Sequence, residues 1–342
     1  MAAQAEVGGF GLGLVKLGSA AAGGPRAGVR LVHESLDRGV RFFDTADAYG
    51  DGTSERVLGQ ALRGRRDGVT VATKGGYRFA ERSAAERAAR RLAAPVLGSV
   101  RALRERGRSS GAPGAGGTGS AYAERVFSPA HLRAAVDGSL RRLRTDHIDL
   151  YQLHGPVAVC GDDVAMLMGA LRREGKIGRF GVGLEVLDHA QAWLEVDGVT
   201  SMQLPFGVLD PEAGREVIPA AQRAGVDVIA RAVFAAGLLV DTSPGATALL
   251  RPEQRALRTA VLQLAEEHGV HPLGLAAWFA RATPGVRTVL VGVSSSRHLA
   301  DNLAHLTGPE PSAGALAALG DALADYAALQ PAGAVDVDGR PG

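Results

Sequence analysis

The stretch Val40-Arg-Phe-Phe-Asp-Thr-Ala-Asp-Ala-Tyr-Gly50 decides how the rest of the chain is interpreted. Val40, Phe42 and Phe43 are typical of a buried strand. Asp44 stands at the end of that strand, and Tyr49 follows five residues later. An acid at a strand tip with a phenol in the next loop indicates a catalytic site, provided that other strands end in groups of matching chemistry.

The composition is that of a large globular protein. The chain has 342 residues, 46% of them hydrophobic, which suffices for one large α/β barrel or for two domains. A formal net charge of +2 predicts no strong attraction to nucleic acid or to a membrane surface. The single cysteine excludes an internal disulfide. Because we find neither a signal-peptide pattern nor an apolar run long enough to span a membrane, we expect a cytoplasmic protein.

Strand and helix patterns alternate along most of the chain. Strands are predicted at 10–17, 40–45, 69–74, 148–154, 180–184, 201–204, 226–231 and 286–292, and helices between and after them, including 31–38, 188–193, 253–268, 273–282 and 315–329. Connections of this length require parallel strands. About eight such units in series predict a closed (β/α)₈ TIM barrel. A doubly wound open sheet is the alternative, but no GxGxxG follows a strand and opens a helix.

Residues 77–126 interrupt this alternation directly after the strand at 69–74. No strand is predicted within them; 83–106 is arginine-rich and predicted to be helical, and 107–120 is rich in Gly, Ser, Pro and Ala. The insertion has too few apolar residues for a domain, so we expect residues 1–342 to form a single barrel domain with a disordered tail at 330–342. An insertion that leaves the C-terminal end of a strand is either an active-site lid or a solvated loop.

Four ionisable side chains are expected to meet at the C-terminal ends of neighbouring strands: Asp44, Tyr49, Lys74 and His154. Lys74 is one of only three lysines, and a buried lysine needs a partner, for which Asp44 is suited. An adjacent ammonium should lower the pKa of the Tyr49 phenol. Tyr49 could then exchange a proton with a carbonyl oxygen that His154 orients. Since no side chain delivers hydride, this set implies a nicotinamide cofactor and no metal ion.

The motifs that carry these residues resemble the aldo-keto reductase family. Phe43-Asp-Thr-Ala-Asp-Ala-Tyr-Gly50 is similar to the family's Asp-Thr-Ala and Tyr-Gly pattern, and Thr73-Lys-Gly75 to its lysine motif. Residues 138–154 are similar to its helix-and-histidine signature. The resemblance covers roughly residues 10–308 apart from the insertion. It implies that Tyr49 is the general acid, that Lys74 and Asp44 tune it, and that His154 orients the substrate.

The same resemblance implies NADP(H), with NAD(H) as an alternative, bound extended across the barrel mouth. It assigns cofactor binding to Gln203, Arg231, Gly237, Leu238, Gly292, Ser294, Arg297, His298, Asp301 and Asn302. A helix N-terminus with serines and an arginine nearby is a suitable phosphate site. Arg297 or His298 could meet a 2′-phosphate, which favours NADP(H).

Two positions depart from the family pattern. The Ser-Asn pair that often follows the strand at 180–184 is replaced here by Gly183 and Leu184, followed by Glu185. Arg231 stands where an aromatic residue commonly stacks on the nicotinamide, and a guanidinium can also stack on a flat ring. These changes bear on the pose of the cofactor more than on the catalytic set.

The function that follows is hydride transfer between NADP(H) and a small-molecule carbonyl or alcohol. A sugar, a polyketide-like ketone and an aliphatic aldehyde are all compatible substrates. One alternative is a non-catalytic barrel that binds nicotinamide as a sensor or subunit. Another is a lyase that uses Lys74 as a Schiff-base amine, which would require an unpaired lysine.

Overall fold

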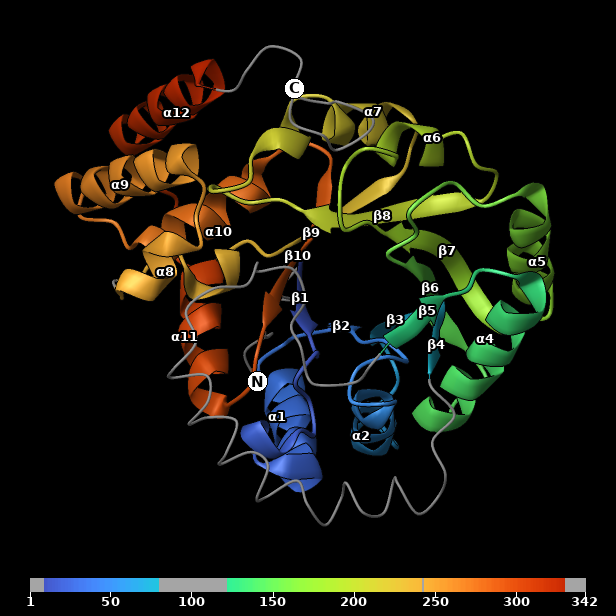
Figure 1. Ribbon diagram of the computed structural model, residues 1–342. Helices are drawn as coiled ribbons and strands as arrows, with labels where there is room; N and C mark the ends of the chain where they lie inside the picture. The colour runs from blue at the N-terminus through green and yellow to red at the C-terminus, as the bar shows by residue number, and fades with distance from the viewer. Residues whose placement is uncertain (1–8, 80–121, 242, 330–342) are drawn as a thin grey trace.

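The computed structural model describes residues 9–79, 122–241 and 243–329, and within them eight parallel strands close into a barrel surrounded by helices (Figure 1). The strand order around the barrel is β1-β10-β9-β8-β7-β6-β3-β2. The barrel strands are β1 (Phe10–Gly13), β2 (Phe42–Asp44), β3 (Thr70–Gly75), β6 (Ile148–His154), β7 (Ile177–Gly183), β8 (Val199–Pro205), β9 (Asp227–Arg231) and β10 (Val286–Gly292). The predicted TIM barrel is confirmed. The open doubly wound sheet is wrong, because β1 pairs with both β2 and β10 and leaves no edge.

Helices follow the strands as predicted, although some begin elsewhere. They are α1 (Gly24–Asp37), α2 (Thr53–Ala61), α4 (Pro129–Leu143), α5 (Asp162–Arg173), α6 (Ala190–Trp193), α7 (Val217–Arg223), α8 (Pro244–Ala248), α9 (Pro252–Glu267), α10 (Pro272–Ala282), α11 (Ser296–Leu306) and α12 (Ala313–Ala328). Helix α1 begins a full turn or more before the predicted Leu31, because Pro25 provides a start that apolar periodicity does not reveal. Ser312 caps α12 by accepting a hydrogen bond from the Ala315 N–H.

Apolar side chains fill the barrel interior beneath the strand tips. Ala72, Leu150, Ile229 and Leu290 form a buried cluster, and Phe42 packs against it. Successive side chains of a strand alternate between its two faces. The residues two positions further along these strands therefore also point inward, one layer higher. Those residues include Asp44, Lys74 and Gln152. The two-residue alternation along each strand therefore places these polar side chains directly above the apolar cluster.

Strand β1 has a glycine at position 11 because the interior is crowded there. A Cβ at Gly11 would lie 2.6 Å from both Leu290 Cδ2 and Phe42 Cδ1. The strand is shorter than the predicted 10–17, because the chain turns away after Gly13. The Leu14 N–H still donates to the Asp44 carbonyl at 2.9 Å, which holds the two strand ends together.

The described ends of the insertion form a hairpin that the sequence did not predict. Strands β4 (Tyr77–Phe79) and β5 (Tyr122–Arg125) pair antiparallel, so the prediction of no strand in 77–126 is wrong at both ends. Strands of three or four residues are too short to show an alternating pattern. The predicted helix at 83–106, the glycine-rich run, the lid and the tail at 330–342 lie outside the described residues.

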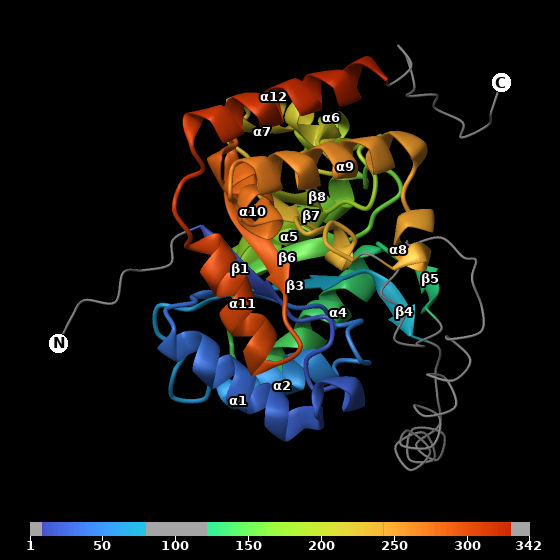
Figure 2. The ribbon, with the colours of Figure 1, turned by 90° about the vertical axis from the view of Figure 1, so that its left-hand side faces the viewer.

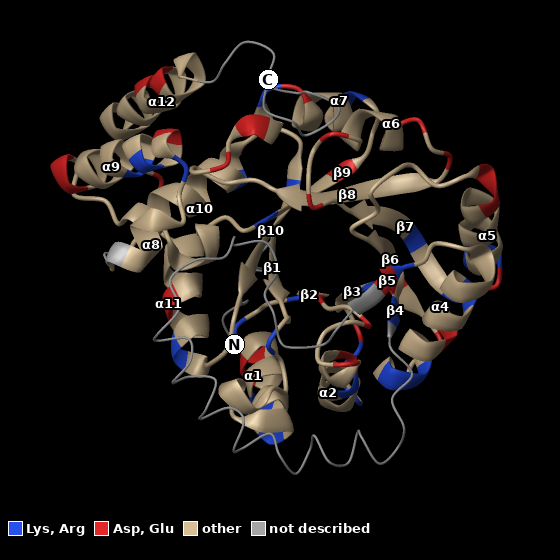
Figure 3. Ribbon diagram, viewed as in Figure 1, with Lys and Arg blue, Asp and Glu red and all other residues tan. Residues whose placement is uncertain are grey.

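The C-terminal helix packs on the outside of the barrel's helical layer. Helices α9 and α12 lie side by side in both views (Figures 1 and 2) and share a second apolar cluster that includes Leu257, Val261, Leu319 and Tyr326. Blue and red segments are interspersed over the outer helices (Figure 3), consistent with the small net charge. Within the described ranges, no helix is both long and apolar enough to cross a membrane.

Candidate active site

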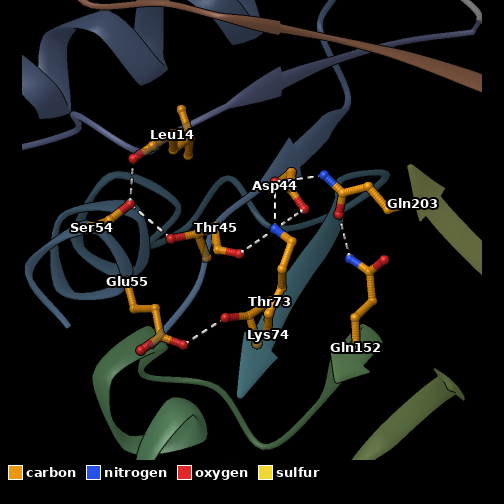
Figure 4. Close-up of polar contacts among 9 residues, drawn as sticks. All are labelled: Leu14, Asp44, Thr45, Ser54, Glu55, Thr73, Lys74, Gln152 and Gln203. Carbon is orange, nitrogen blue, oxygen red and sulfur yellow. Dashed lines mark hydrogen bonds and ion pairs between the residues drawn. The ribbon is translucent and has the colours of Figure 1, made fainter. Parts of the chain in front are cut away.

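A buried ion pair stands at the centre of the barrel mouth. The Lys74 Nζ lies 2.6 Å from both carboxylate oxygens of Asp44 and donates to the Thr45 carbonyl at 3.0 Å (Figure 4). The two side chains are each about 3% exposed. Burial lowers the pKa of the Lys74 ammonium, but attraction and hydrogen bonding to Asp44 and Tyr49 together outweigh burial and raise that pKa, so the lysine is charged. The expected partnership of Lys74 and Asp44 is thus present in the structure.

The loop that carries Tyr49 is anchored to the tip of β1. Thr45 Oγ1 donates to Ser54 Oγ at 2.7 Å, and Ser54 Oγ donates to the Leu14 carbonyl at 2.9 Å (Figure 4). Gly52 occupies the N-cap position of α2, so the Ser54 hydroxyl is left to hold this loop. Because these hydroxyls are fully buried and paired, they restrict the path of the loop.

Two glutamines continue the polar layer away from Asp44. Gln203 Nε2 lies 3.5 Å from Asp44 Oδ2, and Gln152 Nε2 donates to Gln203 Oε1 at 3.0 Å (Figure 4). Gln203 was expected in the cofactor site, whereas Gln152 was missed. The signal for Gln152 was available, since it lies two residues before His154 on one strand and must face the same side.

Tyr49 and His154 complete the predicted set of four. The two rings are 5.7 Å apart between centroids in an edge-to-face arrangement, and Lys74 Nζ is 5.3 Å from the centre of the Tyr49 ring. Burial raises the pKa of the Tyr49 phenol, and the Lys74 ammonium offsets only part of this effect. The expected lowering of that pKa is therefore wrong in net direction, because the removal of water from around the phenol outweighs the nearby charge. Tyr49 is protonated at neutral pH and can act as a proton donor.

His154 is neutral at this position. Burial, followed by the charges of Lys74, Arg231 and Arg125, holds the pKa of its imidazole well below the ordinary value. Its Nδ1 is buried and has no hydrogen-bond partner among the residues that the structure describes. A buried acceptor without a partner is less costly than a buried donor without one. This favours the neutral tautomer that carries its proton on Nε2.

The residues expected around a dinucleotide phosphate gather at the exposed start of α11. Ser295 caps this helix by accepting from the His298 N–H, and Ser294 Oγ lies 2.9 Å from His298 Nδ1. Asn302 Nδ2 donates to the Gly292 carbonyl at 3.0 Å and ties the helix to the tip of β10. Arg297 is 89% exposed and only loosely paired with Asp301, at 3.7 Å. Its guanidinium is thus available to an anion.

The remaining cofactor candidates lie at and after the tip of β9. Arg231 ends β9 and donates to the Leu184 carbonyl at 2.9 Å. The charge of the same guanidinium opposes the rise in the pKa of the Tyr49 phenol, so Arg231 lies near Tyr49. Gly237 and Leu238 follow in and after a short 3₁₀ turn (Ala235–Gly237), and no atom lies within 4 Å of a Cβ built at Gly237. The Arg231 guanidinium is suited to contact the flat nicotinamide ring of a dinucleotide, and the open backbone at Gly237 is suited to contact its pyrophosphate.

Three further side chains lie against the site without having been predicted in it. The Tyr77 ring packs edge-on against His154, 4.8 Å between centroids. Arg125 and Glu185 form an ion pair of 2.6 Å beside it. Tyr77 is three residues after Lys74, but sequence separation alone does not show that its ring contacts His154 at the end of β6. No group of His, Cys, Asp and Glu suited to a metal ion occurs in the described part of the chain.

Comparison with known proteins identifies the family. The family model described as Aldo/keto reductase family matches residues 10–311, which is most of the chain. The protein therefore belongs to the aldo/keto reductase family of oxidoreductases. The chain is similar to the uncharacterized oxidoreductase YqkF of Bacillus subtilis, with 25% identity over 306 residues, 86% of this chain and 85% of that protein. It is 26% identical over 235 residues to the aldo-keto reductase YhdN of Bacillus subtilis, covering 67% of this chain and 59% of that protein.

Solved structures agree on the architecture. The holo form of aldo-keto reductase AKR11C1 from Bacillus halodurans superposes with a TM-score of 0.69 at 25% identity, covering 92% of this chain and 91% of that one. The glycerol dehydrogenase AKR11B4 from Gluconobacter oxydans gives 0.71 at 24% identity, covering 94% of each chain. An aldo/keto reductase from Klebsiella pneumoniae in complex with NADP and acetate gives 0.63 at 24% identity, covering 92% and 90%. The last two likenesses support the fold.

Proposed function

We propose that this protein transfers hydride between NADP(H) and a small-molecule carbonyl or alcohol, with Tyr49 as the proton donor and acceptor. The observation that carries the proposal is the geometry around Lys74. Its ammonium lies 2.6 Å from both oxygens of Asp44 and 5.3 Å from the centre of the Tyr49 ring, which itself meets His154 edge-on. A charged lysine fixed beside a protonated phenol is suited to stabilising that phenol as it loses its proton.

The residues present fit a nicotinamide dinucleotide. The exposed start of α11, with Ser294 and the available guanidinium of Arg297, offers backbone N–H groups and a positive charge for a phosphate. Arg231 and the open backbone at Gly237 lie at the mouth, where the flat ring and the pyrophosphate would be held. When bound, the cofactor supplies the hydride, which no side chain can do. The 2′-phosphate of NADP(H) is the group that Arg297 suits.

The protein's own side chains orient the substrate and transfer the proton. His154 donates from Nε2 to the carbonyl oxygen and fixes its position, since its neutral form is favoured by burial. Tyr49, protonated at neutral pH, gives its proton to the same oxygen as charge develops there. Lys74 stabilises the phenolate that forms, and Asp44 holds the ammonium in place.

The alternative of a Schiff-base lyase finds no support in this geometry. A nucleophilic amine needs a depressed pKa, whereas contact with Asp44 raises the pKa of Lys74. The non-catalytic barrel is disfavoured because all four side chains expected for catalysis converge at one mouth.

The proposal is tested by titrating the purified protein with NADPH and NADH and then measuring NADPH oxidation against aldehydes, ketones and sugars. We expect tighter binding of NADPH than of NADH and turnover with at least one carbonyl class. Binding of neither nucleotide would overturn the proposal. Binding without turnover across the panel would leave the non-catalytic barrel as the better description.

A further inference from the structure

The hairpin β4–β5 brings an aromatic ring directly against the proposed orienting histidine. Tyr77 opens β4 and pairs in register with Arg125, the last residue of β5. The Tyr77 ring meets the His154 ring at 83° with centroids 4.8 Å apart, nearer than the 5.7 Å of Tyr49. Edge-to-face aromatic pairs at this separation are attractive and orient both rings. His154 is thus packed edge-to-face by two tyrosines.

Three side chains, which we call the Tyr77 clasp, hold this ring in place: Tyr77, Arg125 and Glu185. The Arg125 guanidinium pairs with Glu185 at 2.6 Å and lies 5.6 Å from the centre of the Tyr77 ring. The Tyr77 hydroxyl donates to Glu185 Oε1 at 3.2 Å and accepts from Arg125 Nε at 3.3 Å. The clasp therefore joins the hairpin to the segment that follows β7.

Glu185 also packs against the backbone next to His154. Gly155 has a φ of +61°, and a Cβ there would lie 3.0 Å from Glu185 Oε1. Any side chain at this position would have to displace the carboxylate and adopt a strained backbone. The clasp thus contacts His154 through its ring and lies against the residue that directly follows it.

His154 has particular need of such support. A histidine with a chemical role is commonly oriented by a hydrogen bond from its second ring nitrogen. Here Nδ1 is buried without a partner in the described part of the chain. The orientation of the imidazole must then come from packing, and of the two tyrosine rings that contact it in the described ranges, Tyr77 is the closer.

We propose that Tyr77, fixed by Arg125 and Glu185, is a positioning residue that aims His154 at the substrate oxygen. This inference rests on the proposed reductase function of the site. On this proposal, the described ends of the insertion support turnover by orienting His154 and take no part in cofactor binding.

The test compares Tyr77→Leu with Tyr77→Phe. The leucine variant loses the ring, and we expect kcat to fall by about tenfold or more while the NADPH Kd stays within about twofold, because misorientation acts on the reacting complex. The phenylalanine variant keeps the ring and should recover most of kcat. Equal kcat for wild type and Tyr77→Leu would overturn the proposal.

A second comparison uses two Arg–Glu pairs that involve described residues of the hairpin. Arg125→Met breaks the clasp and should lower kcat, whereas Arg78→Met breaks the exposed Arg78–Glu124 pair and should not. Equal losses in both variants would mean that only hairpin stability matters. In the His154→Gln background, Tyr77→Leu should add no further loss; a full additional tenfold loss would show that Tyr77 does not act through His154.

A spectroscopic readout separates failure of this inference from failure of the proposed function. In protein labelled with ¹⁵N-histidine, the signal missing from the His154→Gln spectrum identifies His154. We expect it to report the Nε2–H tautomer and to shift or broaden in Tyr77→Leu but not in Arg78→Met. An unchanged His154 signal in Tyr77→Leu would refute the clasp, whether or not the protein turns over a carbonyl.

Discussion

Lys74 Nζ lies at equal distances of 2.6 Å from the two carboxylate oxygens of Asp44, beneath the mouth of the barrel. Both side chains are about 3% exposed, so neither charge is compensated by water. Each of the two charges therefore needs the other, because a buried charge without its partner destabilises the folded protein.

Lys74→Met should therefore impair both stability and turnover. Removal of the ammonium leaves the Asp44 carboxylate buried without its partner, and we expect the free energy of unfolding to drop by about 3–5 kcal/mol. Chemical denaturation at pH 7 measures this loss. Lys176→Met is the matched control, since Lys176 pairs with Asp137 at the surface and should cost about 1 kcal/mol or less. Similar losses in the two variants would contradict the buried-pair description.

Treatment with borohydride and carbonyl compounds should leave Lys74 unmodified. The ammonium remains charged because Asp44 raises its pKa, so it does not form an imine. Mass spectrometry after incubation with an aldehyde and borohydride checks this. Modification at Lys74 in preference to the more exposed Lys176 would revive the Schiff-base lyase.

His154 should make the protein less stable in mild acid. Its folded-state pKa is held well below the ordinary value by burial, so between that low pKa and about 6.5 the unfolded chain binds a proton that the folded chain does not. Stability then falls as pH drops below about 6.5, by up to about 1.4 kcal/mol per pH unit for one group. Denaturation of wild type and His154→Gln at pH 7 and pH 5 isolates this contribution. The variant should lose less stability than wild type, and an equal loss would mean that His154 titrates normally.

Arg297→Met should weaken NADPH binding selectively. Its guanidinium is 89% exposed at the start of α11, so we expect an increase in the NADPH Kd of about tenfold, the lower part of what charge-assisted hydrogen bonds contribute. NADH lacks the 2′-phosphate and serves as the internal control, with an unchanged Kd. Fluorescence titration measures both. A parallel weakening of NADH would place Arg297 elsewhere on the cofactor.

The sequence predicted those site residues that lie at the end of a strand with a clear apolar pattern. Asp44, Lys74 and His154 each occur at or near the end of a clear apolar strand, and inward alternation follows from the strand itself. The opening strand was predicted from the sequence, but the reason for its glycine at position 11 appeared only in the structure, where Phe42 and Leu290 lie against it.

Other features depend on contacts that a linear pattern does not contain. The short hairpin strands and the packing of Tyr77 on His154 arise from contacts between residues far apart in the sequence. The direction of the Tyr49 pKa shift was mispredicted because it depends on how much water the folded site removes, and the sequence shows only which charges are nearby.

The most direct test of the central claim is turnover by Tyr49→Phe. With a carbonyl substrate that the wild type reduces, we expect kcat to fall by about 10²–10⁴-fold while the NADPH Kd stays within a few-fold, because the phenol acts on the reacting oxygen and not on binding. Tyr326→Phe, which removes a phenol on α12 that contacts Glu212 and Arg251, should keep wild-type turnover. Retention of turnover in Tyr49→Phe, measured by NADPH oxidation at saturating cofactor, would contradict the assignment of Tyr49 as the proton donor.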